Sequence, residues 1–157
     1  MKKLMLLTVV AVFGLTSGFA QSYSAGVTVG LPIGDAGDLY TFNVGIDLDA
    51  LWDISEEFEA GVATGYNHSV LDSDLNGDDF QYIPLAGAAR YSASDDFVLG
   101  ADLGYAIAVG DGDGGFYYRP MVGYNVSENT QITASYRGIS VDGGSFSTVN
   151  LGVNFGL

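Results

Sequence analysis

From Tyr23 to the last residue, the chain alternates apolar residues with small or polar ones, in segments of roughly ten residues. The pattern is clearest at 40–52, where even positions hold Tyr, Phe, Val, Ile, Leu, Ala and Trp, and odd positions hold mostly Thr, Asn, Gly and Asp. Successive side chains of a strand point to opposite faces, so one face here is apolar and the other carries carboxylates. Such an apolar face needs a second packed layer in water, or it can face lipid if a closed barrel pairs every backbone group.

The alternation predicts eight strands separated by polar or glycine-rich connections. Their predicted ranges are 22–33, 39–52, 58–68, 80–91, 97–109, 116–126, 131–140 and 146–157. Short polar turns alternate with loops richer in Gly and Asp, which is typical of outer-membrane barrels whose termini both lie on the periplasmic side. The predicted strand 80–91 fits this pattern poorly. Phe80, Tyr82 and Arg90 all lie at even positions and so share one parity, which would place two aromatic residues on the same face as an arginine. We therefore expect a bulge near Pro84.

The two faces of the predicted strands differ in composition. One face is aliphatic in mid-strand and aromatic near the strand ends, as expected where side chains meet lipid and the two membrane interfaces. The opposite face is small and polar, and it includes all three arginines of the chain. A soluble sandwich would bury the apolar face and leave the polar one wet, whereas side chains can fill the interior of an eight-stranded barrel. The pattern therefore favours a membrane barrel.

Length, charge and cysteine content narrow the class of protein. The 157 residues suffice for one domain, and a mean hydropathy of +0.25 coexists with a net charge of −14, so apolar and acidic residues must be segregated. The sequence has no cysteine, which excludes disulfides and a lipobox lipid anchor. Residues 1–20 have the features of a cleaved signal peptide, so we expect the barrel to occupy 21–157. Cleavage leaves a net charge of −16, which argues against nucleic acid as a partner.

Several short runs resemble those of a known family. They are Tyr82-Ile83-Pro84-Leu85, Arg90-Tyr91, Phe97 to Tyr105, Tyr124-Asn125-Val126-Ser127 and Tyr136-Arg137-Gly138-Ile139. With these runs the chain resembles the outer membrane protein beta-barrel domain family, which is similar to OmpX-type barrels and the OmpA membrane domain. The resemblance implies an all-β, eight-stranded antiparallel up-and-down transmembrane β-barrel in the bacterial outer membrane, inserted by the barrel-assembly machinery among outer-membrane lipid and lipopolysaccharide. Many such barrels end in an aromatic residue, whereas this chain ends in Leu157.

The first candidate site is a charge network inside the barrel. Strand parity turns three arginines and four acids inward, namely Arg90, Arg119, Arg137, Asp47, Asp49, Glu59 and Asp102. Charges inside a barrel are unfavourable unless they are paired or hydrated, so we expect ion pairs across the lumen. These pairs could fill the interior, or they could gate a narrow path for small solutes.

The second candidate is a loop that begins like a calcium-binding loop. Alternating oxygens that converge on one cation are expected from Asp72, Asp74, Asn76 and Asp78. The spacing then fails, because the twelfth position holds Ile83 instead of a bidentate Glu. We therefore expect at most weak attraction of divalent cations, no resident metal and no cofactor. Further acids extend the negative rim to the other loops, namely Asp35, Asp38, Asp111, Asp113 and Asp142.

The third candidate is His68 beside Ser69, a pair that would suit a lipid hydrolase at the outer leaflet. Adjacent residues of a strand point to opposite faces, so the two are poorly placed to act as base and nucleophile. We therefore expect no enzyme activity.

Together these features predict a monomeric outer-membrane protein with a structural or surface-interaction role. Its lumen is expected to be plugged by polar side chains, and its extracellular loops are expected to be acidic. A narrow pore for small solutes or ions is one alternative, and an outer-leaflet lipid-modifying enzyme is the other.

Overall fold

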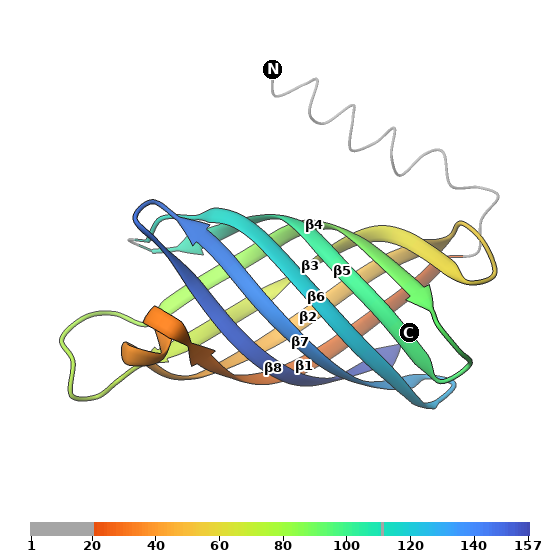
Figure 1. Ribbon diagram of the computed structural model, residues 1–157, viewed down its shortest axis with the longest axis horizontal. Coiled ribbons are helices and arrows are strands. Elements are labelled where there is room, and N and C mark those ends of the chain that lie inside the picture. Colours follow the sequence, from red (N-terminus) through yellow and green to blue (C-terminus); the bar gives the residue numbers. More distant parts are fainter. Residues whose placement is uncertain (1–20, 111) are drawn as a thin grey trace, which may run out of the picture.

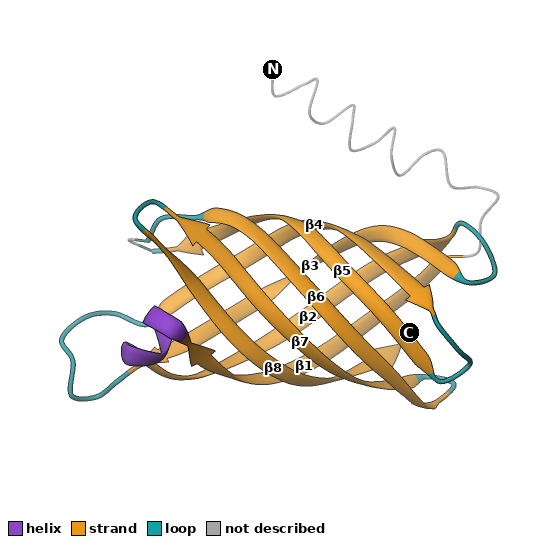
Figure 2. Cartoon of the chain, viewed as in Figure 1, coloured by secondary structure: helices purple, strands orange, loops and turns teal. Residues whose placement is uncertain are grey.

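The computed structural model describes residues 21–110 and 112–157, so the predicted signal peptide at 1–20 lies outside the described residues, as does Asp111. Eight strands form a closed antiparallel barrel in which sequence neighbours pair and β8 pairs back with β1 (Figure 1 and Figure 2). The strands are β1 (Gln21–Ile33), β2 (Tyr40–Asp53), β3 (Phe58–Leu71), β4 (Phe80–Ser92), β5 (Phe97–Val109), β6 (Gly115–Ser127), β7 (Thr130–Val141) and β8 (Gly144–Gly156). All eight predicted strands are confirmed, with ends shifted by at most three residues.

The two ends of the barrel differ. The short turns that join β2 to β3, β4 to β5 and β6 to β7 all lie at the end of the barrel on the right in Figure 1. We call this end the short-turn end. The other end, the loop end, carries the short 3-10 helix η1 (Gly34–Asp38) and the remaining connections. The described chain begins and ends at the short-turn end, where the backbone N–H of Leu157 donates to the carbonyl of Tyr23 at 2.9 Å. Among the described residues, no helix is long and apolar enough to span a bilayer.

The prediction of a bulge near Pro84 is wrong. Strand β4 pairs with β5 in one continuous register. Towards β3 the pairing is interrupted beside Pro84 and then resumes in the same register, because proline lacks the N–H that a ladder needs. Tyr82 and Pro84 therefore keep the parity of Arg90 and face the interior. The register shifts occur instead at the beginning of β2 and at the end of β6.

Apolar side chains cover the outside of the barrel. Most of the mid-strand residues predicted to face outward are exposed, among them Val27, Val29, Val44, Ile46, Leu48, Val62, Leu99, Leu103, Val122 and Leu151. Leu103 in the middle of β5 is 59% exposed, whereas Arg119 on the neighbouring strand is only 4% exposed. A water-soluble fold would reverse this distribution, which is that of a barrel meeting lipid on its outer face.

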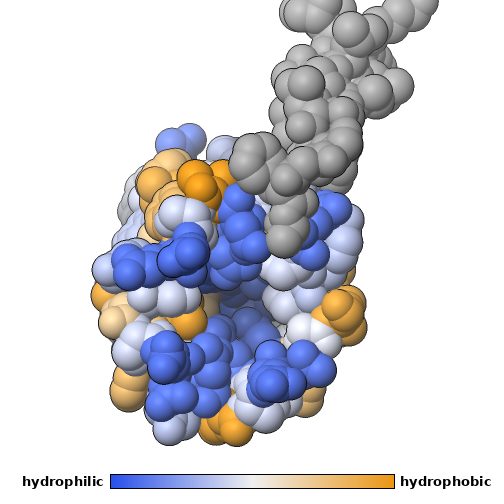
Figure 3. Space-filling model, turned by 90° about the vertical axis from the view of Figure 1, so that its right-hand side faces the viewer, coloured by the Kyte–Doolittle hydropathy of each residue, from blue (hydrophilic) through white to orange (hydrophobic). Residues whose placement is uncertain are grey.

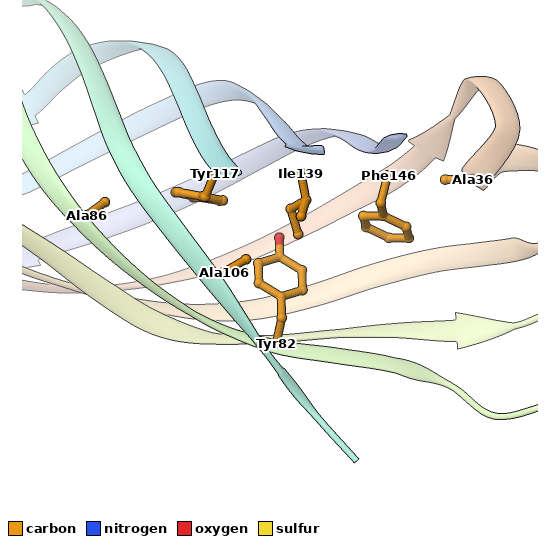
Figure 4. Close-up of a cluster of buried hydrophobic side chains, with 7 residues drawn as sticks. All are labelled: Ala36, Tyr82, Ala86, Ala106, Tyr117, Ile139 and Phe146. Carbon is orange, nitrogen blue, oxygen red and sulfur yellow. The ribbon is translucent and has the colours of Figure 1, made fainter. Parts of the chain in front are cut away.

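The interior contains two zones. The ion layer lies near the middle of the barrel and consists of Asp47, Asp49, Arg90, Asp102, Arg119 and Arg137. The aromatic cap lies towards the loop end and consists of Tyr40, Phe80, Tyr82, Tyr117, Ile139 and Phe146, with Ala36 of η1 beside it. Figure 4 shows Tyr82, Tyr117, Ile139, Phe146 and Ala36 of this group. Tyr82 and Ile139 point towards one another from opposite walls in Figure 4, so the cap reaches across the lumen.

Candidate functional site

Arg119 on β6 is the centre of the ion layer, because its guanidinium group contacts all three aspartates. Its Nε lies 2.6 Å from Asp102 Oδ2, its Nη1 lies 2.9 Å from Asp47 Oδ2, and its Nη2 lies 3.6 Å from Asp49 Oδ1. Asp102 is the cross-strand partner of Arg119 on β5, while Asp47 and Asp49 reach it from β2 on the other side of the lumen. Arginine suits this position because its planar fork can meet several carboxylates at once.

Arg90 and Arg137 complete the ion layer. Arg90 lies 2.6 Å from Asp102 and 3.4 Å from Asp49, and Arg137 lies 2.6 Å from Asp47, measured between guanidinium nitrogens and carboxylate oxygens. Three arginines thus meet three aspartates, all of them at most 6% exposed. The structure therefore brings together six of the seven residues that the sequence assigned to this network, with no net formal charge.

Glu59 is the seventh residue, and it does not join the ion layer. Its carboxylate accepts a hydrogen bond from Ser22 Oγ at 2.9 Å near the short-turn end. Its cross-strand partner is Arg90, as parity requires, but the Arg90 side chain turns towards Asp49 and Asp102 instead. Parity predicts the face that a residue occupies, but it does not predict the depth at which a long side chain finds its partner.

Amide and hydroxyl side chains pack beside the ion layer. Arg137 donates to the side-chain oxygen of Asn67, and Asn43 Nδ2 donates to Ser69 Oγ at 2.8 Å. All four side chains are buried. Neither Asn67 nor Ser69 was predicted as part of this site, although the alternation along β3 gives both residues the parity of the interior.

The aromatic cap was not predicted either. Tyr82, Tyr117 and Ile139 are at most 1% exposed, and the Tyr82 ring centroid lies 6.3 Å from those of Tyr117 and Phe146. Parity offered the signal, because Tyr117 is two residues from Arg119 and so shares its face. The signal was hidden because aromatic residues near the ends of membrane strands are usually expected at the lipid interface.

Hollows open at both ends of the barrel. At the short-turn end, a polar hollow of about 240 Å³ reaches Asp49 and Arg90, and Figure 3 shows hydrophilic side chains around it. At the loop end, a hollow of about 410 Å³ is lined by Tyr40, Phe80 and Phe146. The two share no lining residue. The buried side chains of the ion layer and the cap lie between them.

Gly45 leaves room for the guanidinium group of Arg137. A Cβ at position 45 would lie 2.8 Å from Thr28 Oγ1 and 3.2 Å from Arg137 Nη1. We expect Gly45→Ala to lower the free energy of unfolding by about 1–3 kcal/mol, because overpacking a filled interior displaces its side chains. Gly87→Ala is the matched control, since a Cβ there would meet only the Leu103 carbonyl oxygen, at 3.9 Å. Urea unfolding of the refolded barrel checks this, and equal effects of the two substitutions would contradict tight packing around Arg137.

The structure separates His68 from Ser69. The His68 ring lies on the outer surface, where its Nε2 is 2.7 Å from Asp79 Oδ2. Ser69 Oγ is buried in the lumen and bonded to Asn43. The two side chains have different partners on opposite faces, so the contact between base and nucleophile that a hydrolase needs does not form between them.

The loop between β3 and β4 is held by Asp79, which was not among the predicted cation-binding residues. Asp79 Oδ1 accepts the backbone N–H of Leu71 at 2.9 Å, and Oδ2 contacts His68. These hydrogen bonds, the one from Leu71 first, hold the pKa of the Asp79 carboxyl below its usual value. Asp79 therefore ties the base of the loop to the end of β3.

The predicted cation loop is not assembled as a metal site. Asp72 Oδ1 accepts the backbone N–H of Asp74 at 2.9 Å, which is a local turn bond. Across residues 21–110 and 112–157, no three His, Cys, Asp or Glu side chains come close enough to hold a metal ion. The structure therefore does not gather Asp72, Asp74, Asn76 and Asp78 around one point.

Comparison with solved structures identifies the fold. No family model matches the sequence, and no curated protein matches it. Ail, the attachment invasion locus protein of Yersinia pestis, is 19% identical with a TM-score of 0.58, over 87% of this chain and 97% of Ail. The N-terminal β-barrel domain of Pseudomonas aeruginosa OprF is 13% identical with a TM-score of 0.56, over 88% of this chain and 99% of that domain. Neisserial surface protein A is 18% identical with a TM-score of 0.53, over 88% and 99% respectively.

These identities are low enough that the matches concern the fold alone. One of the Ail structures holds the heparin analogue sucrose octasulfate, which is a property of that protein. The number of strands, their antiparallel order and the closure of β8 onto β1 agree with the sequence-based prediction. The chain therefore has the closed, eight-stranded up-and-down fold of the small bacterial outer-membrane barrels.

Proposed function

We propose that this protein is an integral barrel of the bacterial outer membrane, with a structural role or a role in interactions at its outer surface. The observation that carries the proposal is the inverted distribution of side chains, with an exposed aliphatic belt outside and six buried charges inside. A bilayer gives such an exterior its apolar surroundings, and closure leaves no strand edge unpaired. Outer-membrane lipid and lipopolysaccharide would surround it, the barrel-assembly machinery would insert it, and we expect a monomer.

A plugged lumen, as opposed to a pore, is the second part of the proposal. Its support is the succession of the ion layer and the aromatic cap, in which Asp102, Arg137, Tyr82, Tyr117 and Ile139 are each at most 1% exposed. An ion crossing this stretch would have to displace several paired charges and then several packed rings. The interior of an eight-stranded barrel is also narrow enough for side chains to fill. A solute path has less support.

A catalytic role is not part of the proposal. The His–Ser pair that could have supported a lipid-modifying enzyme has its two members on opposite faces of β3. The three aspartates of the ion layer are all engaged by arginine, which leaves no carboxylate there free to act as an acid or base.

The orientation that we propose places the loop end outside the cell and both termini in the periplasm. Its support is that the termini and the short turns share one end, as in bacterial outer-membrane barrels generally. The loop end would then present an acidic surface, with Asp35, Asp78, Asp113 and Asp142 exposed on it. Such a surface favours cationic partners over anions such as the heparin analogue held by Ail.

Fractionation of cells that express the full chain tests location and orientation together. We expect the mature chain in the outer membrane, and we expect faster migration in a gel before boiling than after, because a closed barrel resists detergent until it is heated. An epitope inserted between Asn76 and Gly77 should be labelled on intact cells, whereas one after Leu157 should need permeabilised cells. Recovery in the soluble periplasm, or the reverse labelling, would overturn the proposal.

A further inference from the structure

The hollow at the loop end has the size and lining of a ligand pocket. Its volume of about 410 Å³ falls within the range of roughly 300–1,000 Å³ found for small-molecule sites. Its apolar wall is formed by Ala36, Tyr40, Phe80, Val141 and Phe146, and its rim is formed by Asp35, Asp113 and Asp142. We call this hollow the loop-end cup. It is open to solvent and separated from the short-turn end by the cap and the ion layer.

Three aromatic rings meet in the wall of the cup. The ring centroids lie 4.6 Å apart for Phe80 and Phe146, 5.5 Å for Tyr40 and Phe146, and 6.4 Å for Tyr40 and Phe80. The planes of these pairs are inclined by 52°, 76° and 50° respectively, so the rings are not stacked flat on one another. At these separations the rings pack against one another and form one continuous aromatic wall of the cup. An ammonium group that lies against such a wall is attracted to it, because each ring face carries partial negative charge.

The carboxylates on the rim have no cationic partner. Asp35, Asp113 and Asp142 are exposed, and none of them forms an ion pair with any residue of 21–110 or 112–157. The basic side chains cannot compensate them, because the three arginines of the described chain are committed to the ion layer and no lysine follows residue 20. The mouth of the cup is therefore strongly negative while its wall is aromatic and aliphatic.

We propose that the loop-end cup binds an organic ammonium ion that carries an apolar body. The apolar body would lie against Phe146, Phe80 and Val141, and the ammonium group would lie between the rings and the rim carboxylates. Both halves of the ligand are required by the lining, since a bare metal ion would not use the rings and a neutral hydrocarbon would not use the carboxylates. Anions would be repelled by the rim.

Binding of benzyltrimethylammonium to the refolded mature chain tests this inference directly. The protein is held in non-ionic maltoside micelles, because phosphocholine detergents carry a quaternary ammonium group that would compete. Backbone amide chemical shifts are followed by NMR. We expect the amide shifts of Gly143 and Gly144 at the cup to change on binding, whereas the amide shift of Gly100 near the short-turn end should not change. Benzyl alcohol, phenylacetate and tetramethylammonium are the neutral, anionic and body-less control probes.

Two variants separate the contributions of charge and ring. Changing Asp35, Asp113 and Asp142 together to asparagine should weaken binding about tenfold or more at low salt, and this difference should shrink as salt is added. Phe146→Leu, which keeps an apolar side chain, should weaken binding by about fivefold. Changing Asp53, Asp95 and Asp96 together to asparagine removes the same number of charges at the short-turn end, so this variant is the charge-matched control and should leave binding unchanged. Heat-modifiable migration shows whether each variant is folded. If Phe146→Leu does not fold, the triple aspartate variant, whose changed residues are all exposed, still tests the inference.

The outcomes that overturn the inference are distinct from those that bear on location. Equal binding of benzyl alcohol and the cation, or equal binding of tetramethylammonium, would exclude a site that needs both halves of the ligand. Amide shifts confined to the lipid-facing belt, or insensitive to the variants, would mean partition into the micelle alone. The inference goes beyond the proposed function, and because refolded protein is used, its failure would leave the outer-membrane assignment untouched.

Discussion

Replacing Arg119 with methionine is expected to lower the free energy of unfolding by about 3–5 kcal/mol, the usual effect of removing one partner from a buried ion-pair network. Methionine fills much of the same space, so the loss reflects charge more than volume. Without Arg119, the three aspartates of the ion layer face only Arg90 and Arg137. One buried carboxylate is then uncompensated. Urea unfolding of the refolded protein in lipid vesicles, followed by the fluorescence of its single tryptophan, Trp52, measures the change.

A second substitution separates the effect of an unpaired buried carboxylate on stability from the effect of lost side-chain packing. Adding Asp49→Asn to Arg119→Met should recover part of the lost stability, because Arg90 then pairs with Asp102 and Arg137 pairs with Asp47. Asp49 is the best choice, since its two contacts, at 3.4 and 3.6 Å, are the longest in the layer. Asp49→Asn alone should destabilise the barrel. If Arg119→Met changed the free energy of unfolding by less than about 1 kcal/mol, the ion pairs of Arg119 would be hydrated and would contribute little to stability. That result would contradict an ion layer from which water is excluded.

Leu103→Arg is expected to destabilise the barrel by about 2–4 kcal/mol, the effect of arginine on the lipid face near the bilayer midplane. Leu103 lies at the middle of β5 and is 59% exposed on the outer face. A charged group there has neither water nor a carboxylate within reach. The same vesicle-based unfolding assay measures the loss.

Val126→Arg provides the matched control. Val126 is also an exposed aliphatic residue, but it lies next to the last residue of β6, at the short-turn end. An arginine there can reach the interfacial water, so the expected loss is about 0–1 kcal/mol. If both substitutions were equally mild, the outer face would not be in lipid at the depth proposed.

Most of the fold could be predicted because a strand has only two faces. In β2 and β5 the alternation places Ile46 and Leu103 outside and Asp47 and Asp102 inside, and the structure confirms all four. Membrane strands make this pattern easy to read, since both faces are constrained, one by lipid and the other by a narrow lumen. The same alternation places all six residues of the ion layer on the inner face, although it does not predict which of them pair.

The rest depends on depth along the barrel, which parity does not encode. Glu59 has the correct face but lies near the short-turn end, so it bonds to Ser22 and not to an arginine. Tyr82 has the parity of Arg90, yet an aromatic residue near a strand end suggested the lipid interface and a bulge. The cup rim combines three loops that are far apart in sequence, so only closure of the barrel brings Asp35, Asp113 and Asp142 together.

Planar-bilayer conductance of the refolded mature chain is the most direct test of the central claim, that the interior of this membrane barrel is closed. The unmodified protein is expected to show no steady conductance after insertion, because the ion layer and the aromatic cap lie in series. Single replacements of Arg90, Arg119 and Arg137 serve as probes of the path. A steady conductance of the unmodified protein, with an ion selectivity that these replacements change, would contradict the claim and place a pore through the ion layer.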